Sequence, residues 1–483
     1  MTLVWKYRKQ EGCYAAEGIV YCANPVRPDL QSLNIYIPEA LMGEREGTHS
    51  DTVAAISCGT AYASGEVPIV FYNDIGGYAE CVPAGLTPRN RCYLDDGYVL
   101  VSVGARGRQT LDGEGRACGK APSALVDLKA AVRWLRAHAD DLPAGNIERI
   151  VSVGTSAGGA MSSLLAVSGN APAYLPMLEQ IGACMGERDD VFAAQCYCPI
   201  IDLEHADMAY EWMFRSKRIY TMGPRQPPCV LGSFERELSR VLAESYPAYV
   251  NGLDLGLELG ADGRSGSYYE ELMGCLTASL QRFVDDNAAA SDARASLLVE
   301  LDPAGMFIER ADEGGMRIHD LDAYVRAYIG RMKGCPAFDP VSMGSPENEE
   351  FGRQGATAES SDYTRHFARA TSSAIADVLA CGNTSHLPDA PFAVGDEGDL
   401  ARAIELINPM TYLAGERVAD IAPHVRIRVG SRDADHSFSA SFNLYRALLR
   451  RDVDVDYEIV WGRGHCEADR PGEFSAWVDS ICK

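Results

Sequence analysis

The chain lacks an excess of basic residues. Its 483 residues include 44 lysines and arginines against 68 aspartates and glutamates, which gives a formal net charge of −24. A surface of this sign repels phosphate backbones and anionic lipids, so nucleic acid and membrane are both disfavoured as partners. A neutral small molecule such as an ester meets no such penalty.

Long hydrophobic runs and a secretion signal are also missing. No stretch approaches the ~20 apolar residues that a membrane helix needs, and residues 1–18 contain no continuous apolar core. The 15 cysteines are an odd number and are scattered along the chain without a framework. We therefore expect reduced thiols and a cytoplasmic location.

A glycine-rich turn surrounds Ser156. Residues 154–159 read Gly-Thr-Ser-Ala-Gly-Gly, directly after the apolar run 150–153 and directly before the helix-like run 160–165. On such a sharp turn the serine hydroxyl projects away from the sheet, and larger side chains at the glycine positions would collide with the neighbouring strand and helix. A chain with 46 glycines can match Gly-x-Ser-x-Gly by chance, but the strand–turn–helix context is typical of the nucleophile elbow of serine hydrolases.

Short apolar runs recur on both sides of this turn. They lack strict alternation, as expected for strands that are covered on both faces. The runs are residues 33–37, 68–72, 98–103, 150–153, 193–200, 425–429 and 456–461. An amphipathic segment at 123–142 precedes the elbow, and this alternation of helix and strand predicts an α/β fold with a mostly parallel central sheet.

The middle of the chain has a different character. Helix-like segments at 233–244, 268–287 and 321–332 are separated by loops rich in glycine, serine, proline and acidic residues. The simplest account is a large helical insertion between strands six and seven of one sheet. We predict an α/β-hydrolase core at residues 1–203 and 401–483, with a lid at 204–400.

A nucleophilic serine needs a base and an orienting acid, which follow it in the order acid, then histidine in this fold. The strand at 425–429 leads into Asp433 and Asp435, and the strand at 456–461 leads into His465. Of the nine histidines, His465 alone follows the last strand. We predict the triad Ser156–His465–Asp433, with Asp433 preferred to Asp435 because it lies nearer the end of its strand.

Ester hydrolysis also needs donors for the developing oxyanion. We predict the backbone N–H of Ala157, which directly follows the nucleophile, and that of Gly77, in the loop after the strand at 68–72. The alternative for Gly77 is an ordinary type II turn.

The elbow at 154–160 resembles that of the bacterial tannases, which are serine esterases that release gallate from tannins. Similar stretches are residues 195–207, the Asn-Pro-Met at 408–410, the Asp-Ala-Asp at 433–435 and the C-terminal 471–479. The likeness spans nearly the whole chain and is weakest in the insertion.

The resemblance implies a binding site for the hydroxyl groups of a galloyl ring. Carried onto this sequence, its lysine is Lys333, its aspartate is Asp435 and its glutamate is Glu347, with Glu349 and Glu350 as alternatives to Glu347. Carboxylates accept hydrogen bonds from phenolic hydroxyls, and an ammonium donates to them.

The resemblance also sets a point of difference. Fungal tannases and some feruloyl esterases join cysteines next to the serine and the histidine by a disulfide. Here Cys466 follows His465, but Thr155 precedes Ser156, so Cys466 is expected to be a free thiol.

We therefore predict a tannase-like carboxylic ester hydrolase that acts on small aromatic galloyl esters through an acyl-enzyme. No metal and no organic cofactor is implied. The first alternative is a feruloyl or general aromatic carboxylesterase, which shares the triad but differs in its ring contacts. The second is a catalytically silent binding protein of the same fold.

Overall fold

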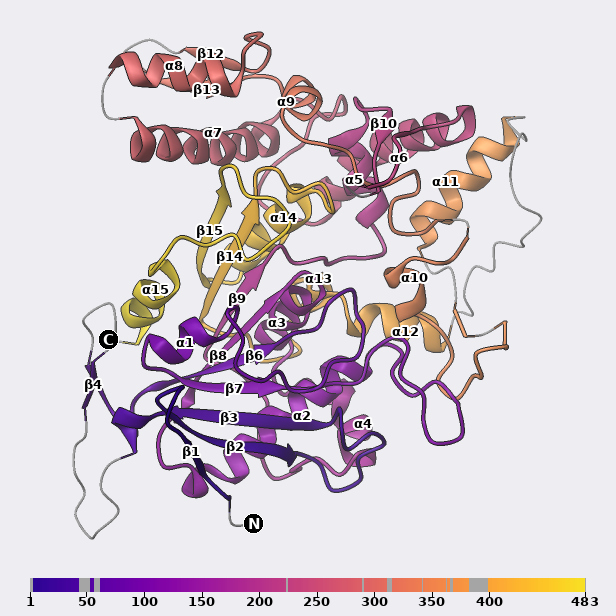
Figure 1. Cartoon of the computed structure of the whole chain (residues 1–483). Helices are drawn as coiled ribbons and strands as arrows, with labels where there is room; N and C mark the ends of the chain where they lie inside the picture. The colour runs from indigo at the N-terminus through magenta and orange to yellow at the C-terminus, as the bar shows by residue number, and fades with distance from the viewer. Residues whose placement is uncertain are drawn as a thin grey trace.

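A sheet of nine strands runs through the centre of the molecule (Figure 1). Its spatial order is β1-β2-β3-β7-β6-β8-β9-β14-β15. The strands are β1 (Lys6–Arg8), β2 (Cys13–Val20), β3 (Ser32–Pro38), β6 (Pro68–Asn73), β7 (Val99–Val103), β8 (Asn146–Thr155), β9 (Ala193–Tyr197), β14 (His424–Gly430) and β15 (Asp454–Val460). A separate hairpin pairs β4 (Val53–Ala55) with β5 (Ala61–Ala63). The computed structural model describes residues 3–42, 53–55, 61–222, 225–288, 291–310, 315–340, 342–361, 363–364, 368–381 and 398–482.

The strand directions are those of an α/β-hydrolase. From β1 to β7 along the sheet neighbouring strands are antiparallel, and from β7 to β15 they are parallel. Counted from β2, the spatial order is 1-2-4-3-5-6-7-8. The predicted fold is thus confirmed, and residues that follow β6, β8, β14 and β15 emerge at one edge of the sheet.

Helices cover both faces of the sheet, which explains why the central strands are largely apolar. All residues of β6 and β7 are buried. In Figure 1, α1 and α15 lie together on one side, joined by a ring contact of 4.8 Å between Tyr93 and Phe474, while α2 and α3 lie on the other. The covering helices are α1 (Arg91–Asp95), α2 (Ser123–Ala137), α3 (Ala157–Val167), α4 (Leu175–Gln180), α14 (Phe438–Leu449) and α15 (Glu473–Ile481).

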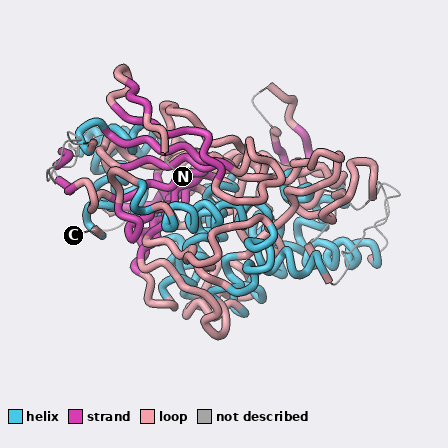
Figure 2. Tube along the Cα trace, turned by 90° about the horizontal axis from the view of Figure 1, so that it is seen from below, coloured by secondary structure: helices cyan, strands magenta, loops and turns pink. Residues whose placement is uncertain are grey.

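A largely helical insertion separates β9 from β14, which are the sixth and seventh strands counted from β2. It lies beside the β14–β15 end of the sheet in Figure 1, and Figure 2 shows a large group of helices away from the side where both chain ends lie. Its helices are α5 (Ala206–Phe214), α6 (Ser233–Gly252), α7 (Ser267–Asn287), α8 (Ser291–Leu301), α9 (Leu321–Ala327), α10 (Pro346–Glu350), α11 (Arg369–Ala380), α12 (Asp399–Leu406) and α13 (Pro409–Leu413). Two short hairpins complete it: β10 (Ile219–Tyr220) with β11 (Cys229–Val230), and β12 (Ile308–Arg310) with β13 (Met316–Ile318). None of the helices in the described ranges has the length and apolar character needed to cross a lipid bilayer.

Candidate active site

Ser156 occupies the turn between β8 and α3. Its φ of 61° and ψ of −121° lie outside the regions that ordinary side chains favour, and such strain is typical of a nucleophile elbow. The backbone N–H of Ser156 donates to the carbonyl of Tyr197 on β9, and that of Gly158 donates to the carbonyl of Ile75. The turn is therefore held from both neighbouring strands.

The glycines of the elbow are required by close backbone packing. A Cβ at Gly154 would lie 2.2 Å from the carbonyl oxygen of Gly158 and 2.7 Å from Nδ2 of Asn73, and one at Gly159 would lie 2.5 Å from the carbonyl oxygen of Tyr197. Asn73, at the end of β6, donates to the carbonyls of Val153 (3.1 Å) and Gly158 (3.3 Å). Asn73 thus supports the elbow, a role that no motif in the sequence indicates.

Gly154→Ala is therefore expected to destabilise the fold by roughly 1–3 kcal/mol, because the two nearest neighbours of the new methyl group are backbone atoms of Gly158 that cannot turn away. Urea unfolding measures this change. Gly113→Ala is the matched control, since Gly113 is exposed and nothing lies within 4 Å of a Cβ there. Equal stability of the two variants would show that the elbow has room for a side chain.

Ser156, His465 and Asp433 form one hydrogen-bonded chain. Nδ1 of His465 lies 2.7 Å from Oδ2 of Asp433, and its Nε2 lies 2.8 Å from Oγ of Ser156. When Nδ1–H donates to the carboxylate, the lone pair on Nε2 is left to accept the serine proton. The structure thus brings together the three residues that sequence order selected, from the ends of β8, β14 and β15.

The surroundings favour an ionised acid and a basic imidazole. Burial alone would raise the pKa of Asp433, which is fully buried, but His436 and His465 hold it well below its usual range. Burial alone would lower the pKa of His465, but the charge and hydrogen bond of Asp433 raise it above its ordinary value. The backbone N–H of Asp435 adds a 2.9 Å hydrogen bond to Oδ1 of Asp433.

A second histidine adjoins the acid. His436 is buried, its Nδ1 lies 3.1 Å from Oδ2 of Asp433, and its ring centroid lies 5.7 Å from that of His465. Sequence reasoning set His436 aside as a base because it is too close to Asp433 along the chain to face it across the site. The spacing of three residues between Asp433 and His436, just before α14, is the feature of the sequence that indicates this contact.

Gly77 lies in the loop after β6 and lines the same cavity as Ser156. Its φ of 52° is in the left-handed region, where glycine is favoured, and its carbonyl accepts a 2.8 Å hydrogen bond from Nε of Arg108. Ala157 is the first residue of α3, and the N–H of a first helical residue has no partner within its helix. Gly77 thus lines the cavity at Ser156, and Ala157 directly follows Ser156.

The cavity at Ser156 has a volume of about 810 Å³, which is within the range of small-molecule sites. The core contributes Ser156, His465, Gly77, Ile200 and Asp435 to its lining. The insertion supplies the rest of the wall, from the β10–β11 hairpin, the start of α6, and residues 332–347. A bound molecule would therefore touch both parts of the chain.

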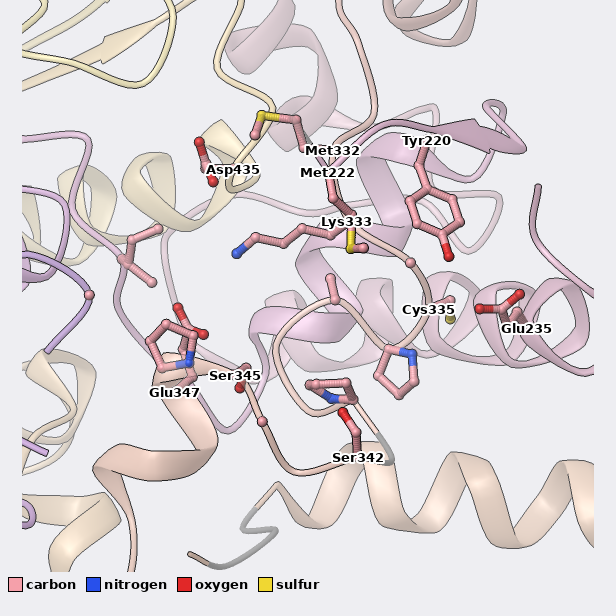
Figure 3. A pocket seen from close by; sticks show the side chains of 18 of the residues that line it. Tyr220, Met222, Glu235, Met332, Lys333, Cys335, Ser342, Ser345, Glu347 and Asp435 are labelled. Carbon is pink, nitrogen blue, oxygen red and sulfur yellow. The ribbon is translucent and has the colours of Figure 1, made fainter. Parts of the chain in front are cut away.

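The three side chains predicted to bind ring hydroxyls face this cavity. Lys333, Glu347 and Asp435 all line it, and Figure 3 shows the ammonium group of Lys333 reaching toward the space between the two carboxylates. Nζ of Lys333 lies 3.8 Å from the ring centroid of Phe338. Within the described residues, none of the three side chains has a hydrogen-bond or ion-pair partner, so all three are available to a ligand.

The other two candidate glutamates point elsewhere. The carboxylate of Glu349 pairs with Arg108 and accepts a 2.6 Å hydrogen bond from Gln109. Glu350 is buried, and this burial raises the pKa of its carboxyl well above its ordinary value. The positive charges of Lys120 and Arg108 lower that pKa only in part. Of the three glutamates, only Glu347 lines the cavity.

Two cysteines adjoin the triad. Every described cysteine is a free thiol, including Cys466 as expected. The buried thiol of Cys198 donates to the carbonyl of Cys466 at 3.1 Å, and its sulfur lies within 4.8 Å of one ligand atom each of Asp433 and His465. These three side chains are the one group with metal-ligand proximity within the described ranges, and each of their atoms already has a hydrogen-bond partner.

A strained serine at the strand–helix turn, hydrogen-bonded through histidine to a buried carboxylate, defines an α/β-hydrolase of the serine esterase class. Residues 64–198 match a family model described as BD-FAE. No curated protein matches the chain.

Solved structures give a closer relationship. Tannin acyl hydrolase from Lactobacillus plantarum, in its native structure, is 31% identical with a TM-score of 0.82, and the match covers 100% of this chain and 97% of that one. A tannin acyl hydrolase in complex with ethyl gallate is 30% identical, with a TM-score of 0.81 and coverage of 100% and 97%. The Fusobacterium nucleatum tannase is 31% identical, with a TM-score of 0.79 and coverage of 100% and 98%. The chain belongs to the tannase family and is a carboxylic ester hydrolase.

Proposed function

We propose that this enzyme hydrolyses esters of gallate and closely related polyhydroxybenzoates. The proposal rests on Lys333, Glu347 and Asp435, which face the cavity at Ser156 and have no hydrogen-bond or ion-pair partner among the described residues. A ring with adjacent hydroxyl groups offers donors to the two carboxylates and acceptors to the ammonium. Structures of tannin acyl hydrolase in complex with ethyl gallate and with 3,4-dihydroxybenzoate support this assignment.

In the proposed reaction, Oγ of Ser156 attacks the ester carbonyl while Nε2 of His465 takes its proton. Asp433 holds the imidazole in the required tautomer and stabilises the imidazolium. The N–H groups of Ala157 and Gly77 donate to the tetrahedral oxyanion. His465 then protonates the departing alcohol, which leaves an acyl-Ser156, and the same histidine activates water to release the acid.

The proposal also assigns roles to the two parts of the chain. Residues 1–203 and 401–483 act as the hydrolase core, and residues 204–400 act as a lid that carries Lys333 and Glu347. The reaction needs no metal ion and no organic cofactor. The cytoplasmic location predicted from the free thiols is part of the same proposal.

Comparison of three aromatic methyl esters tests the substrate assignment. A site built to pair with ring hydroxyls rejects an analogue that lacks them, because its buried charges are then left unpaired. We expect kcat/KM for methyl gallate to exceed that for methyl benzoate by ~100-fold or more, with the protocatechuate ester between them. Lys333→Ala and Asp435→Ala should each reduce the ratio of kcat/KM for methyl gallate to that for methyl benzoate. In both variants kcat/KM for nitrophenyl acetate should stay close to that of the wild type.

The alternatives give different results in this experiment. Equal kcat/KM for the gallate and benzoate esters would indicate a general carboxylesterase, and a preference for methyl ferulate would indicate a feruloyl esterase. No turnover of any ester, with gallate bound in a calorimeter, would indicate a silent binding protein.

A further inference from the structure

The hydroxyl of Tyr210 joins the two walls of the cavity that carry Lys333 and Asp435. Tyr210 lies on α5, the first helix of the insertion, and is fully buried. Its Oη donates to the carbonyl of Ala434 at 3.0 Å. The same oxygen accepts the backbone N–H groups of Met332 at 3.3 Å and Lys333 at 3.2 Å. We call the loop that carries Met332 and Lys333 the lysine loop, and the loop of Asp433–Asp435 the acid loop. Because Ala434 lies between Asp433 and Asp435, one oxygen atom links these two loops.

The ring of Tyr210 supports the same arrangement. It packs edge-on against Phe338, with centroids 6.0 Å apart and an angle of 86° between the ring planes. Phe338 in turn lies 3.8 Å below the ammonium of Lys333. The guanidinium carbon of Arg331 lies 5.4 Å from the centroid of the Tyr210 ring. Tyr210 therefore supports the main chain of Lys333 directly, through a hydrogen bond, and its side chain indirectly, through Phe338.

A buried ion pair completes the support of the lysine loop. Arg331 and Glu211, the residue after Tyr210, are both fully buried and pair with each other. Arg331 donates through Nε to the carbonyl of Lys333 at 2.8 Å and through Nη2 to that of Gly334 at 3.0 Å. This pair fixes the loop to α5 and, through the carbonyl of Lys217 and the hydroxyl of Ser239, to other parts of the insertion, whereas the hydroxyl of Tyr210 fixes it to the acid loop.

We propose that Tyr210 is a positioning residue for substrate selection, which sets the spacing between the Lys333 ammonium and the Asp435 carboxylate. This inference rests on the proposed function, because the spacing matters only if ring hydroxyls bind between these two charged groups. Two charged groups on separate loops discriminate strongly only if their separation matches that of the hydroxyls they bind. The hydroxyl of Tyr210 couples the loops without itself lining the cavity.

Tyr210→Phe removes this oxygen and keeps the ring contacts with Phe338 and Arg331. We expect kcat/KM for methyl gallate to fall by about 10-fold, which corresponds to the loss of one hydrogen-bonded link, with most of the change in KM. The preference for gallate over benzoate should fall by a similar factor, and nitrophenyl acetate should be turned over at close to the wild-type rate. Hydrogen–deuterium exchange at the amides of Met332 and Lys333 should become faster in the variant.

Tyr246→Phe is the matched control. Tyr246, on α6, is equally buried, and its hydroxyl bonds to Ser439 at 2.9 Å and to Asn443 at 3.1 Å, away from both loops. It should lose a similar amount of stability but keep the wild-type substrate preference and the wild-type exchange at 332–333. A Tyr210→Phe enzyme that keeps the wild-type preference for methyl gallate over methyl benzoate would overturn the positioning role.

The exchange measurement separates the two proposals. If the wild-type enzyme shows no preference for gallate, the substrate assignment fails, while faster exchange confined to Tyr210→Phe still supports the link between the loops. If the preference is present but the variant retains it, the positioning role fails and the substrate assignment stands.

Discussion

Ser156→Ala is expected to reduce kcat for nitrophenyl acetate and methyl gallate by roughly 10⁴-fold or more, because the attacking oxygen is removed while the backbone of the elbow is kept. His465→Ala should lose about as much, since members of a triad act as a unit. Steady-state rates and circular dichroism spectra measure the loss and confirm that the fold remains.

A serine-directed phosphonate provides the independent check on this pair of variants. It should inactivate the wild-type enzyme with one equivalent bound, and peptide mapping should find the label on Ser156. Activity within tenfold of wild type in either alanine variant, or a label on another serine, would rule out the serine mechanism.

Asp433→Asn is expected to lower kcat by about 10⁴-fold even though the residue changes little in size. A neutral amide can donate to Nδ1 of His465, and the imidazole proton then lies on Nε2. A protonated Nε2 has no lone pair with which to accept the proton of Ser156. The amide also provides no charge to stabilise the imidazolium. Rates on nitrophenyl acetate, a substrate that does not use the ring-binding residues, isolate this effect.

Asp435→Asn is the control for that substitution. Asp435 lies two residues away and touches the acid only through its backbone N–H, so its side chain should matter for gallate esters and little for nitrophenyl acetate. A larger loss for Asp435→Asn than for Asp433→Asn on the acetate would exchange the roles of the two aspartates.

The central sheet was predictable because its strands are buried on both faces. Apolar runs such as those in β6 and β7 result from burial alone, and the order of serine, acid and histidine follows from the order of the strands that precede them. β2 was missed for a local reason: its register shifts between Ala16 and Ile19, and Gly18 has a φ of 69°. A bulge of this kind interrupts the pattern on which strand prediction depends.

The insertion was less predictable because tertiary contacts override its local signals. α6 continues to Gly252 past Pro247, which lies inside the helix and is buried. α9 ends at Ala327 rather than near residue 332, since Arg331 is drawn into its pair with Glu211 and the chain there becomes a loop. The proximity of Tyr210 to Ala434 joins residues far apart in the chain, and no periodicity encodes such a contact.

The place where the insertion leaves and rejoins the core has a further consequence. β9 and β14 are adjacent in the sheet, with Cys196 opposite Ile427, so the two ends of the insertion start from neighbouring strands. Closing a longer or shorter loop between fixed neighbouring points changes the chain entropy only slowly with length. Chain closure by itself therefore sets little limit on the length of this segment. Because the segment supplies most of the cavity wall, its replacement would change the groups that meet a bound molecule, while Ser156, His465 and Asp433 would keep their places at the ends of the strands.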